Sequence, residues 1–161
     1  QGDWSSDVCS SDLLAGLPDC QPELERAARS RDPKRRLALA RALPRKAAAS
    51  HYHYAITHGD KRVRLQAARW AQFISLQDAW TLAADPSPGL RRALARGLTS
   101  EGPLSVLAHL ASDRHYLVRA QVARTLRHGE PAALPILERL AQDKSLVVRQ
   151  AAQKNSRTGL A

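Results

Sequence analysis

The sequence predicts an all-α fold, an α-solenoid or superhelix of about five stacked helical hairpins. Three observations lead to this prediction. A short motif of Asp, Arg and small apolar residues occurs five times along the 161 residues. Apolar residues surround each of these arginines at helical spacing. Aromatic residues make up 4% of the chain, which favours thin helices stacked through small side chains over a core built on large rings.

The repeat is defined by an arginine that follows an aspartate. Successive anchoring arginines are 28, 27, 28 and 30 residues apart, a nearly constant period that is typical of helical repeat arrays. The distance from Asp to Arg is four residues in the first two units and six in the other three, so the first two turns are expected to be shorter. The anchoring arginines are Arg36, Arg64, Arg91, Arg119 and Arg149, and the aspartates are Asp32, Asp60, Asp85, Asp113 and Asp143.

Each arginine lies within the second helix of a predicted hairpin. Position +3 from the arginine is apolar in all five units, and positions −1, +4 and +7 are apolar in four of them, which is the spacing of one buried helix stripe. Position +4 is alanine in four units, and this small side chain allows another helix to approach closely. We expect the aspartate to cap the second helix of each hairpin.

The first predicted hairpin begins with a short helix that follows a turn at 17–22. Asp32 and Pro33 then open the second helix, with a capping side chain followed by a proline at the first helical position. Pro44 is expected to end that helix. The hairpins are predicted at about 21–43, 44–74, 75–99, 103–128 and 131–156, within one domain that spans 14–161.

The second hairpin starts with the least regular segment, 45–58. His51 and His58 share a helix face there, whereas His53 points elsewhere, so the spacing does not make a metal chelate and interfacial packing is favoured. The two tryptophans that follow, Trp70 and Trp80, are able to stack a nucleobase, but we favour the filling of gaps between units.

The last three hairpins are separated by turn sequences. Asp85-Pro86-Ser87-Pro88-Gly89 predicts a turn inside the third hairpin. Ser-Glu-Gly-Pro at 100–103 and His-Gly-Glu-Pro at 128–131 mark the junctions to the fourth and fifth. The pattern is most regular from Ser105 onward.

The first residues stand apart from the repeat. Residues 3–13, DWSSDVCSSDL, have no apolar period and resemble the translated read-through of a sequencing adapter. We therefore expect 1–13 to be a non-native or disordered tail. Whether the chain is a fragment of a longer array is left open.

Charge and cysteine content limit the classes of function. The chain has 25 basic and 15 acidic residues, a net charge of +10, and the tail contributes acidic residues alone, so the rest is more basic still. Cys20 is the one cysteine outside the tail, which supports neither a disulfide framework nor a metal site and suggests the reducing cytoplasm. No apolar run reaches the length of a membrane helix, so no membrane partner is expected.

The repeated unit has the form D-x-x-x-x-V-R-x-x-(A/V)-A-x-x-L. It resembles the HEAT-like (armadillo-type) repeats of bacterial scaffold proteins, phycobilisome-lyase-type repeats and some DNA-alkylation-repair proteins. It is also similar to the leucine-rich repeat variant, whose unit is slightly shorter and is followed by an Asn-Pro that this chain lacks. The residues that carry the resemblance are Asp113, Val118, Arg119, Val122, Ala123 and Leu126.

The resemblance covers about 21–155 and implies that the repeated Asp and Arg form a structural ladder along the stack. Helix geometry agrees, because at 100° per residue the arginine lies at the edge of the buried stripe and needs a partner there. The aspartate of the same or the next unit is the expected partner. The resemblance specifies architecture and transfers no catalytic residue.

A second row of cations lies five residues after each anchor, on the side opposite the buried stripe. Stacking would align them about 8–10 Å apart on the concave face, where they suit an extended anion such as nucleic acid or an acidic protein segment. The alternative is that arginine is a good helix former and that duplication copied a solvated face. The row consists of Arg41, Arg69, Arg96, Arg124 and Lys154.

The sequence therefore predicts a non-catalytic binding or scaffold module that recognises a protein partner through its concave face. Nucleic-acid binding through the cation row is the alternative. Base excision and bilin attachment rest on resemblance alone, and Asp78 is better explained as a first-turn residue than as a catalytic acid. We find no phosphate-binding loop, no Ser-His-Asp motif, no paired Cys and no HExxH, so no enzyme activity, cofactor, metal or small-molecule substrate is expected.

Overall fold

The computed structural model describes residues 21–43, 45–98, 103–126 and 131–157. These residues form ten α-helices and two short 3₁₀ helices, and they contain no strand. The predicted all-α fold is confirmed. The expected tail at 1–13 and the expected helix stop at Pro44 lie outside the described residues.

The chain divides into two compact units, Gln1–Val63 and Arg64–Ala161. The boundary falls inside α5 (Lys61–Arg69), the second helix of the second predicted hairpin. The single domain over 14–161 stays a prediction.

The first unit contains α2 (Gln21–Arg29), α3 (Pro33–Ala42) and α4 (Arg45–His58). Asp32 begins α3 as predicted, because its carboxylate accepts the backbone N–H of Lys34 at 2.9 Å. Helix α3 packs against both α2 and α4. The described core of this unit consists of Leu37, Leu39, Ala40, Ala48, Tyr52, Ala55, Ile56 and Val63.

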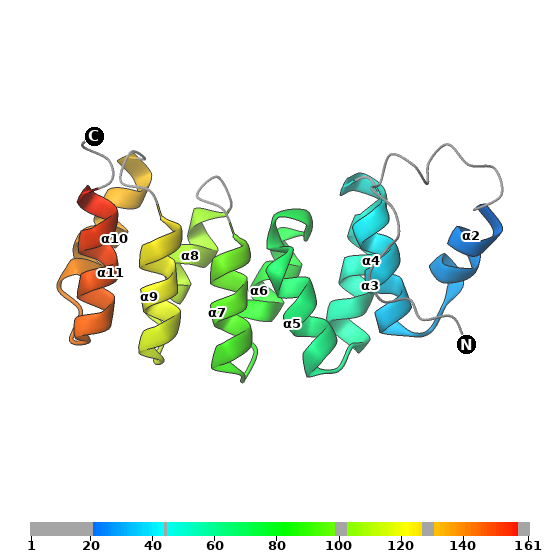
Figure 1. Ribbon diagram of the computed structural model, residues 1–161, viewed down its shortest axis with the longest axis horizontal. Helices are drawn as coiled ribbons and strands as arrows, with labels where there is room; N and C mark the ends of the chain where they lie inside the picture. Colours follow the sequence, from blue (N-terminus) through cyan, green and yellow to red (C-terminus); the bar gives the residue numbers. More distant parts are fainter. Residues whose placement is uncertain (1–20, 44, 99–102, 127–130, 158–161) are drawn as a thin grey trace. The chain divides into compact units, whose positions relative to one another are not determined.

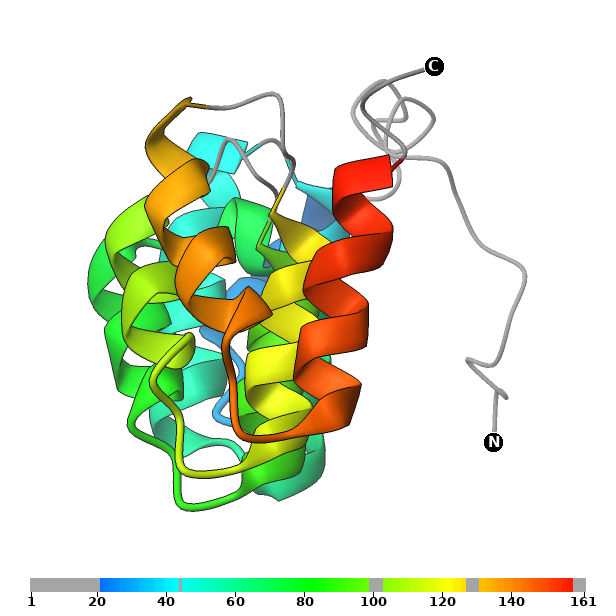
Figure 2. The ribbon, with the colours of Figure 1, turned by 90° about the vertical axis from the view of Figure 1, so that its left-hand side faces the viewer.

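The second unit continues from Arg64 through three hairpins that form two layers. Helices α7, α9 and α11 lie side by side in one layer, and α6, α8 and α10 form the other (Figures 1 and 2). Each of the three predicted hairpin ranges holds one helix of each layer. The elements are η2 (Ala71–Phe73), α6 (Leu76–Ala83), α7 (Pro88–Gly97), α8 (Leu104–Leu110), α9 (Tyr116–Thr125), η3 (Pro131–Ala133), α10 (Leu134–Ala141) and α11 (Leu146–Arg157).

The predicted apolar stripe is buried in this unit. In α9, Val118, Val122 and Ala123 are all 0% exposed. Position +7 is also buried, but its predicted helical conformation is wrong. Leu126 has φ −69° and ψ 140°, which is extended backbone, and it ends α9 while its N–H still donates to the carbonyl of Val122. The chain leaves the helix at this leucine and still places its side chain in the core.

The prediction that an aspartate caps every second helix is only partly right. Asp32 and Asp60 accept backbone N–H groups of their own helix starts, the latter from Val63 at 2.9 Å. Asp113 instead precedes the cap by two residues and accepts the N–H of His115, the N-cap of α9, at 2.8 Å. The two extra residues in these turns move the carboxylate away from the helix start. Asp85 and Asp143 do the same with Ser87 and Ser145.

Neighbouring second helices approach closely near their C-terminal ends. A Cβ atom on Gly97 would lie 2.3 Å from the carbonyl oxygen of Ala68, so a glycine is required where α7 meets α5. One step along, the hydroxyl of Thr125 donates to the carbonyl of Ala95 at 2.7 Å and ties α9 to α7. Both contacts use the carbonyl of the repeated alanine at position +4.

Candidate functional site

An arginine from each of two hairpins forms a forked ion pair with the aspartate of the next hairpin. In Arg91, Nε lies 2.6 Å and Nη2 2.9 Å from the two carboxylate oxygens of Asp113. In Arg119, the same atoms lie 2.6 and 2.8 Å from those of Asp143. The side chains of all four residues are at most 10% exposed, so these pairs are buried. Bidentate geometry of this kind is the strongest form of an Arg–carboxylate contact.

The third nitrogen of each guanidinium holds the turn of its own hairpin. Nη1 of Arg119 donates to the carbonyls of Asp113 at 2.7 Å and Arg114 at 3.3 Å. Nη1 of Arg91 donates in the same way to Asp85 and Pro86. One side chain therefore ties its own turn to the turn of the next hairpin, which fixes the distance between them.

The pairs keep both partners charged. Burial alone would raise the pKa of Asp113, but the hydrogen bond from Arg91 and the N–H of His115 outweigh it and lower that pKa. The hydrogen bond from Arg119 lowers the pKa of Asp143 against the smaller effect of burial. The same hydrogen bonds raise the pKa of each arginine.

The other predicted ladder residues differ. Arg64 pairs with Asp85, with its Nε 3.0 Å from Oδ2, and its side chain is 29% exposed against at most 8% for Arg91 and Arg119. Arg36 donates to the carbonyl of Ser30 at 2.8 Å and lies over the ring of Tyr54, 4.2 Å from its centroid, and it meets no carboxylate among the described residues. Asp32 and Asp60 serve as helix caps instead.

The last anchor, Arg149, makes the hydrogen bonds to the turn of its own hairpin. Its Nη1 donates to the carbonyls of Asp143 at 2.8 Å and Lys144 at 3.1 Å. Nε and Nη2 have no acceptor within the described part of the chain. The structure therefore joins three of the five predicted arginines to an aspartate.

The predicted cation row is exposed, and the structure gives it a local role that the sequence did not indicate. Four of its members lie in the last turn of their helices. A cation there interacts favourably with the C-terminal carbonyls by about 0.3–1 kcal/mol, which is a structural reason for recurrence in register. The exposed residues are Arg41, Arg69, Arg96, Arg124 and Lys154.

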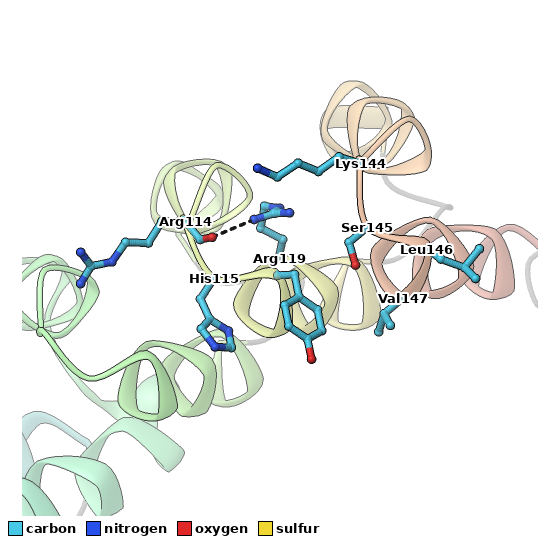
Figure 3. Close-up of a pocket in the computed structure, with 8 residues that line it drawn as sticks. Arg114, His115, Arg119, Lys144, Ser145, Leu146 and Val147 are labelled. Atoms are coloured by element: carbon cyan, nitrogen blue, oxygen red, sulfur yellow. Dashed lines mark hydrogen bonds between the residues drawn. The ribbon is translucent and has the colours of Figure 1, made fainter.

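A groove of about 520 Å³ lies between the N-terminal ends of α9 and α11 (Figure 3). Three apolar side chains beside it are exposed, Leu146 by 57%, Tyr116 by 42% and Val147 by 38%. The groove is lined by Arg114, His115, Tyr116, Arg119, Lys144, Ser145, Leu146 and Val147. Sequence reasoning missed it, although Tyr116 and Leu146 stand at equivalent positions three residues before their anchors and share an apolar character.

The other polar residues considered from sequence have structural surroundings. Ser75 caps α6 by accepting the N–H of Asp78 at 3.1 Å, and its hydroxyl donates to the Asp78 carboxylate at 2.7 Å. His51 is buried, and the described residues contain no group of three or more side chains able to hold a metal ion. Trp80 packs edge-on against His109 of the next hairpin.

These features define a helical-hairpin repeat protein whose hairpins are joined by buried Arg–Asp pairs. Residues 78–156 match the family model described as HEAT repeats, so this part of the chain consists of HEAT-like repeats. HEAT repeats are commonly protein-interaction scaffolds and are generally not enzymes. No curated protein and no solved structure gives a significant match. In the part of the chain that the structure describes, no helix is both long and apolar enough to cross a bilayer.

Proposed function

We propose that the chain is a non-catalytic protein-binding module and that the groove between α9 and α11 receives a segment of the partner. The observation that carries the proposal is the exposure of Tyr116, Leu146 and Val147 together at one cleft, with the cations Arg114 and Lys144 beside them. From the sequence we predicted that the partner binds the concave face of the array, whereas the described residues favour this groove as the binding site.

The chemistry of the groove defines the partner. An apolar side chain that fills it gains about 1.5–3 kcal/mol from burial. Asp or Glu on either side of that residue would meet Arg114 and Lys144, which favours fast association and the correct partner more than raw affinity. The partner segment is therefore an apolar residue flanked by acidic ones. The net charge of +10 attracts such a segment from a distance.

Peptide display on the full chain tests this proposal. We expect selected peptides to carry an apolar residue between acidic ones, and we expect Leu146→Ser to weaken their binding about tenfold, as loss of one buried apolar contact implies. Leu76→Ser is the matched control, because Leu76 is 54% exposed on α6, outside the groove. Selected peptides that bind the Leu146→Ser variant as tightly as the wild type, or that show no acidic preference, would count against the groove.

Nucleic-acid binding through the cation row is the second candidate. The observation that favours it is the close approach of α5, α7 and α9 at their C-terminal ends, which sets Arg69, Arg96 and Arg124 on neighbouring helices. The observation against it is the local role of these cations in their last turns.

Titration of a DNA duplex at two salt concentrations separates the candidates. If the row binds phosphates, affinity falls steeply with salt, and Arg96→Glu with Arg124→Glu abolishes binding. The matched control is Arg114→Glu with Lys144→Glu, which changes the net charge by the same amount but does so at the groove. Binding that is insensitive to salt, or that the control weakens equally, removes the cation row from consideration.

A further inference from the structure

Helix α9 begins with a cap that a histidine side chain makes. Nδ1 of His115 accepts the backbone N–H of Leu117 at 3.3 Å, and the backbone N–H of His115 donates to Asp113 at 2.8 Å. Ser87 stands at the same position before α7, where its side chain makes no cap within the described part of the chain. A ring nitrogen accepts a hydrogen bond only when it carries no proton. The cap of α9 therefore requires the neutral ring of His115, with its proton on Nε2.

This cap belongs to the groove between α9 and α11. His115 and Tyr116 both line the groove, and their rings are stacked with the centroids 5.3 Å apart and the planes inclined by 12° (Figure 3). Tyr116 is the first residue of α9 and is 42% exposed, whereas His115 is half-buried. The cap thus fixes the helical turn that presents Tyr116 to a partner, and its histidine remains open to protons from solvent.

Histidine is the only type of side chain in the lining of this groove that ordinarily changes charge between about pH 5 and 8. Arginine and lysine keep their charge over this range. Despite burial, the hydrogen bond from Arg91 lowers the pKa of Asp113, so that carboxylate also stays ionised. The charged groups around the ring among the described residues are Asp113, Arg114, Arg119, Lys144 and, from α7, Arg91.

We propose that His115 makes binding at the groove dependent on pH: the neutral ring holds the start of α9 and Tyr116 in place, and a proton on Nδ1 releases them. The proton turns Nδ1 from an acceptor into a donor, which is unable to bind the N–H of Leu117. It also places a positive charge at the N-terminal end of a helix, where the helix dipole disfavours cations. The inference rests on the proposed function of the groove and adds that the partner is bound more weakly as pH falls.

The direction of the effect separates this mechanism from simple charge attraction. If the proton acted through its charge alone, a partner with acidic residues would bind more tightly as pH falls. Loss of the cap acts in the opposite direction, because a smaller fraction of the chain then has the first turn of α9 in the binding conformation. A typical helix cap changes such an equilibrium by about fivefold.

NMR of the ¹⁵N-labelled full chain without a ligand tests the release itself. The ring signal of His115 is identified by its absence in His115→Asn, which keeps an acceptor at the cap and does not titrate. Between about pH 7.5 and 5.5, we expect the Leu117 amide signal to move with the midpoint of the His115 ring and its protection against exchange to fall by up to about fivefold. In His115→Asn, this amide should stay in place. The matched control is His109→Gln, which removes an exposed histidine of α8 outside the groove and should leave the Leu117 titration unchanged.

Titration of a display-selected acidic peptide without histidine at both pH values tests the consequence for binding. The carboxylates of the peptide stay largely ionised above about pH 5.5. The wild type should lose affinity by about two- to fivefold at the lower pH, whereas His115→Asn should bind equally at both.

A Leu117 amide that does not follow the His115 ring, or that moves equally in His115→Asn, overturns the proposal. A wild-type affinity that stays level or rises as pH falls also overturns it. If no selected peptide binds at either pH, the proposed function of the groove fails, while the Leu117 titration still decides whether the proton releases the cap.

Discussion

Replacing Arg119 with leucine removes the central contact between the hairpins of α9 and α11. The substitution deletes the two hydrogen bonds to Asp143, at 2.6 and 2.8 Å, and leaves a carboxylate that is 10% exposed without its cation. Hydrogen bonds to charged groups contribute about 1.5–3 kcal/mol each, so two give about 3–6 kcal/mol. Breaking a buried ion pair by removing one partner costs about 3–5 kcal/mol, which agrees. We expect a loss of about 3–5 kcal/mol.

Urea unfolding followed by circular dichroism measures this loss in Arg119→Leu, in Asp143→Asn and in the double variant. Because Asp143→Asn removes the charge that Arg119→Leu would strand, the double variant should be less destabilised than the sum of the two, by about 1–3 kcal/mol. Arg114→Leu is the matched control, since Arg114 is exposed and should change stability by less than about 0.5 kcal/mol. A cost below about 1 kcal/mol for Arg119→Leu, or strictly additive single effects, would refute this reasoning.

Three further outcomes follow. Gly97→Ala should cost about 1–3 kcal/mol in urea unfolding, because its Cβ would lie 2.3 Å from a backbone oxygen of α5. His51→Leu should flatten the dependence of stability on pH, because burial lowers the pKa of His51 below its ordinary 6.5; its contribution is fully present above that value and is lost as pH falls towards the folded pKa. Asp143→Asn should also make stability less dependent on pH in the acid range. The lowered pKa of Asp143 stabilises the fold above about pH 3.8, and this contribution is lost as pH falls below that value.

Each of these outcomes has a control and a contrary result. Gly89→Ala meets only Ser87 Oγ at 3.8 Å, so it should be neutral or stabilising, and equal costs at both glycines would contradict the close approach. His53→Gln removes an exposed histidine of the same helix, and a pH profile that flattens equally in this variant would contradict the role of burial at His51. An acid-unfolding midpoint that Asp143→Asn does not alter would show that the ion pair contributes nothing in that range.

Sequence periodicity predicted the parts of this structure that depend on local spacing. The burial of Val118 and Val122 was predictable, because an apolar stripe can be recognised from the spacing of residues within one helix. The cap of α9 was mispredicted because two additional residues in a turn change which group the aspartate reaches. The contact of Arg36 with Tyr54 was also not predictable, because it depends on how α3 packs on α4.

The groove escaped prediction for a related reason. Tyr116 and Leu146 are 30 residues apart, and each by itself is an ordinary exposed apolar residue. Only the packing of α9 against α11 brings their helix ends together. The role of the cation row in the last helical turns was missed because periodicity does not fix the last residue of a helix.

Chemical-shift mapping of a display-selected acidic peptide on the ¹⁵N-labelled full chain would locate the binding surface directly. The proposed function predicts that the largest amide shifts fall on Tyr116, Leu146 and Val147 and that Leu146→Ser raises the peptide concentration needed to produce them by about tenfold. Shifts confined to Arg96 and Arg124 at the opposite helix ends, or binding that leaves the groove amides unchanged, would contradict it.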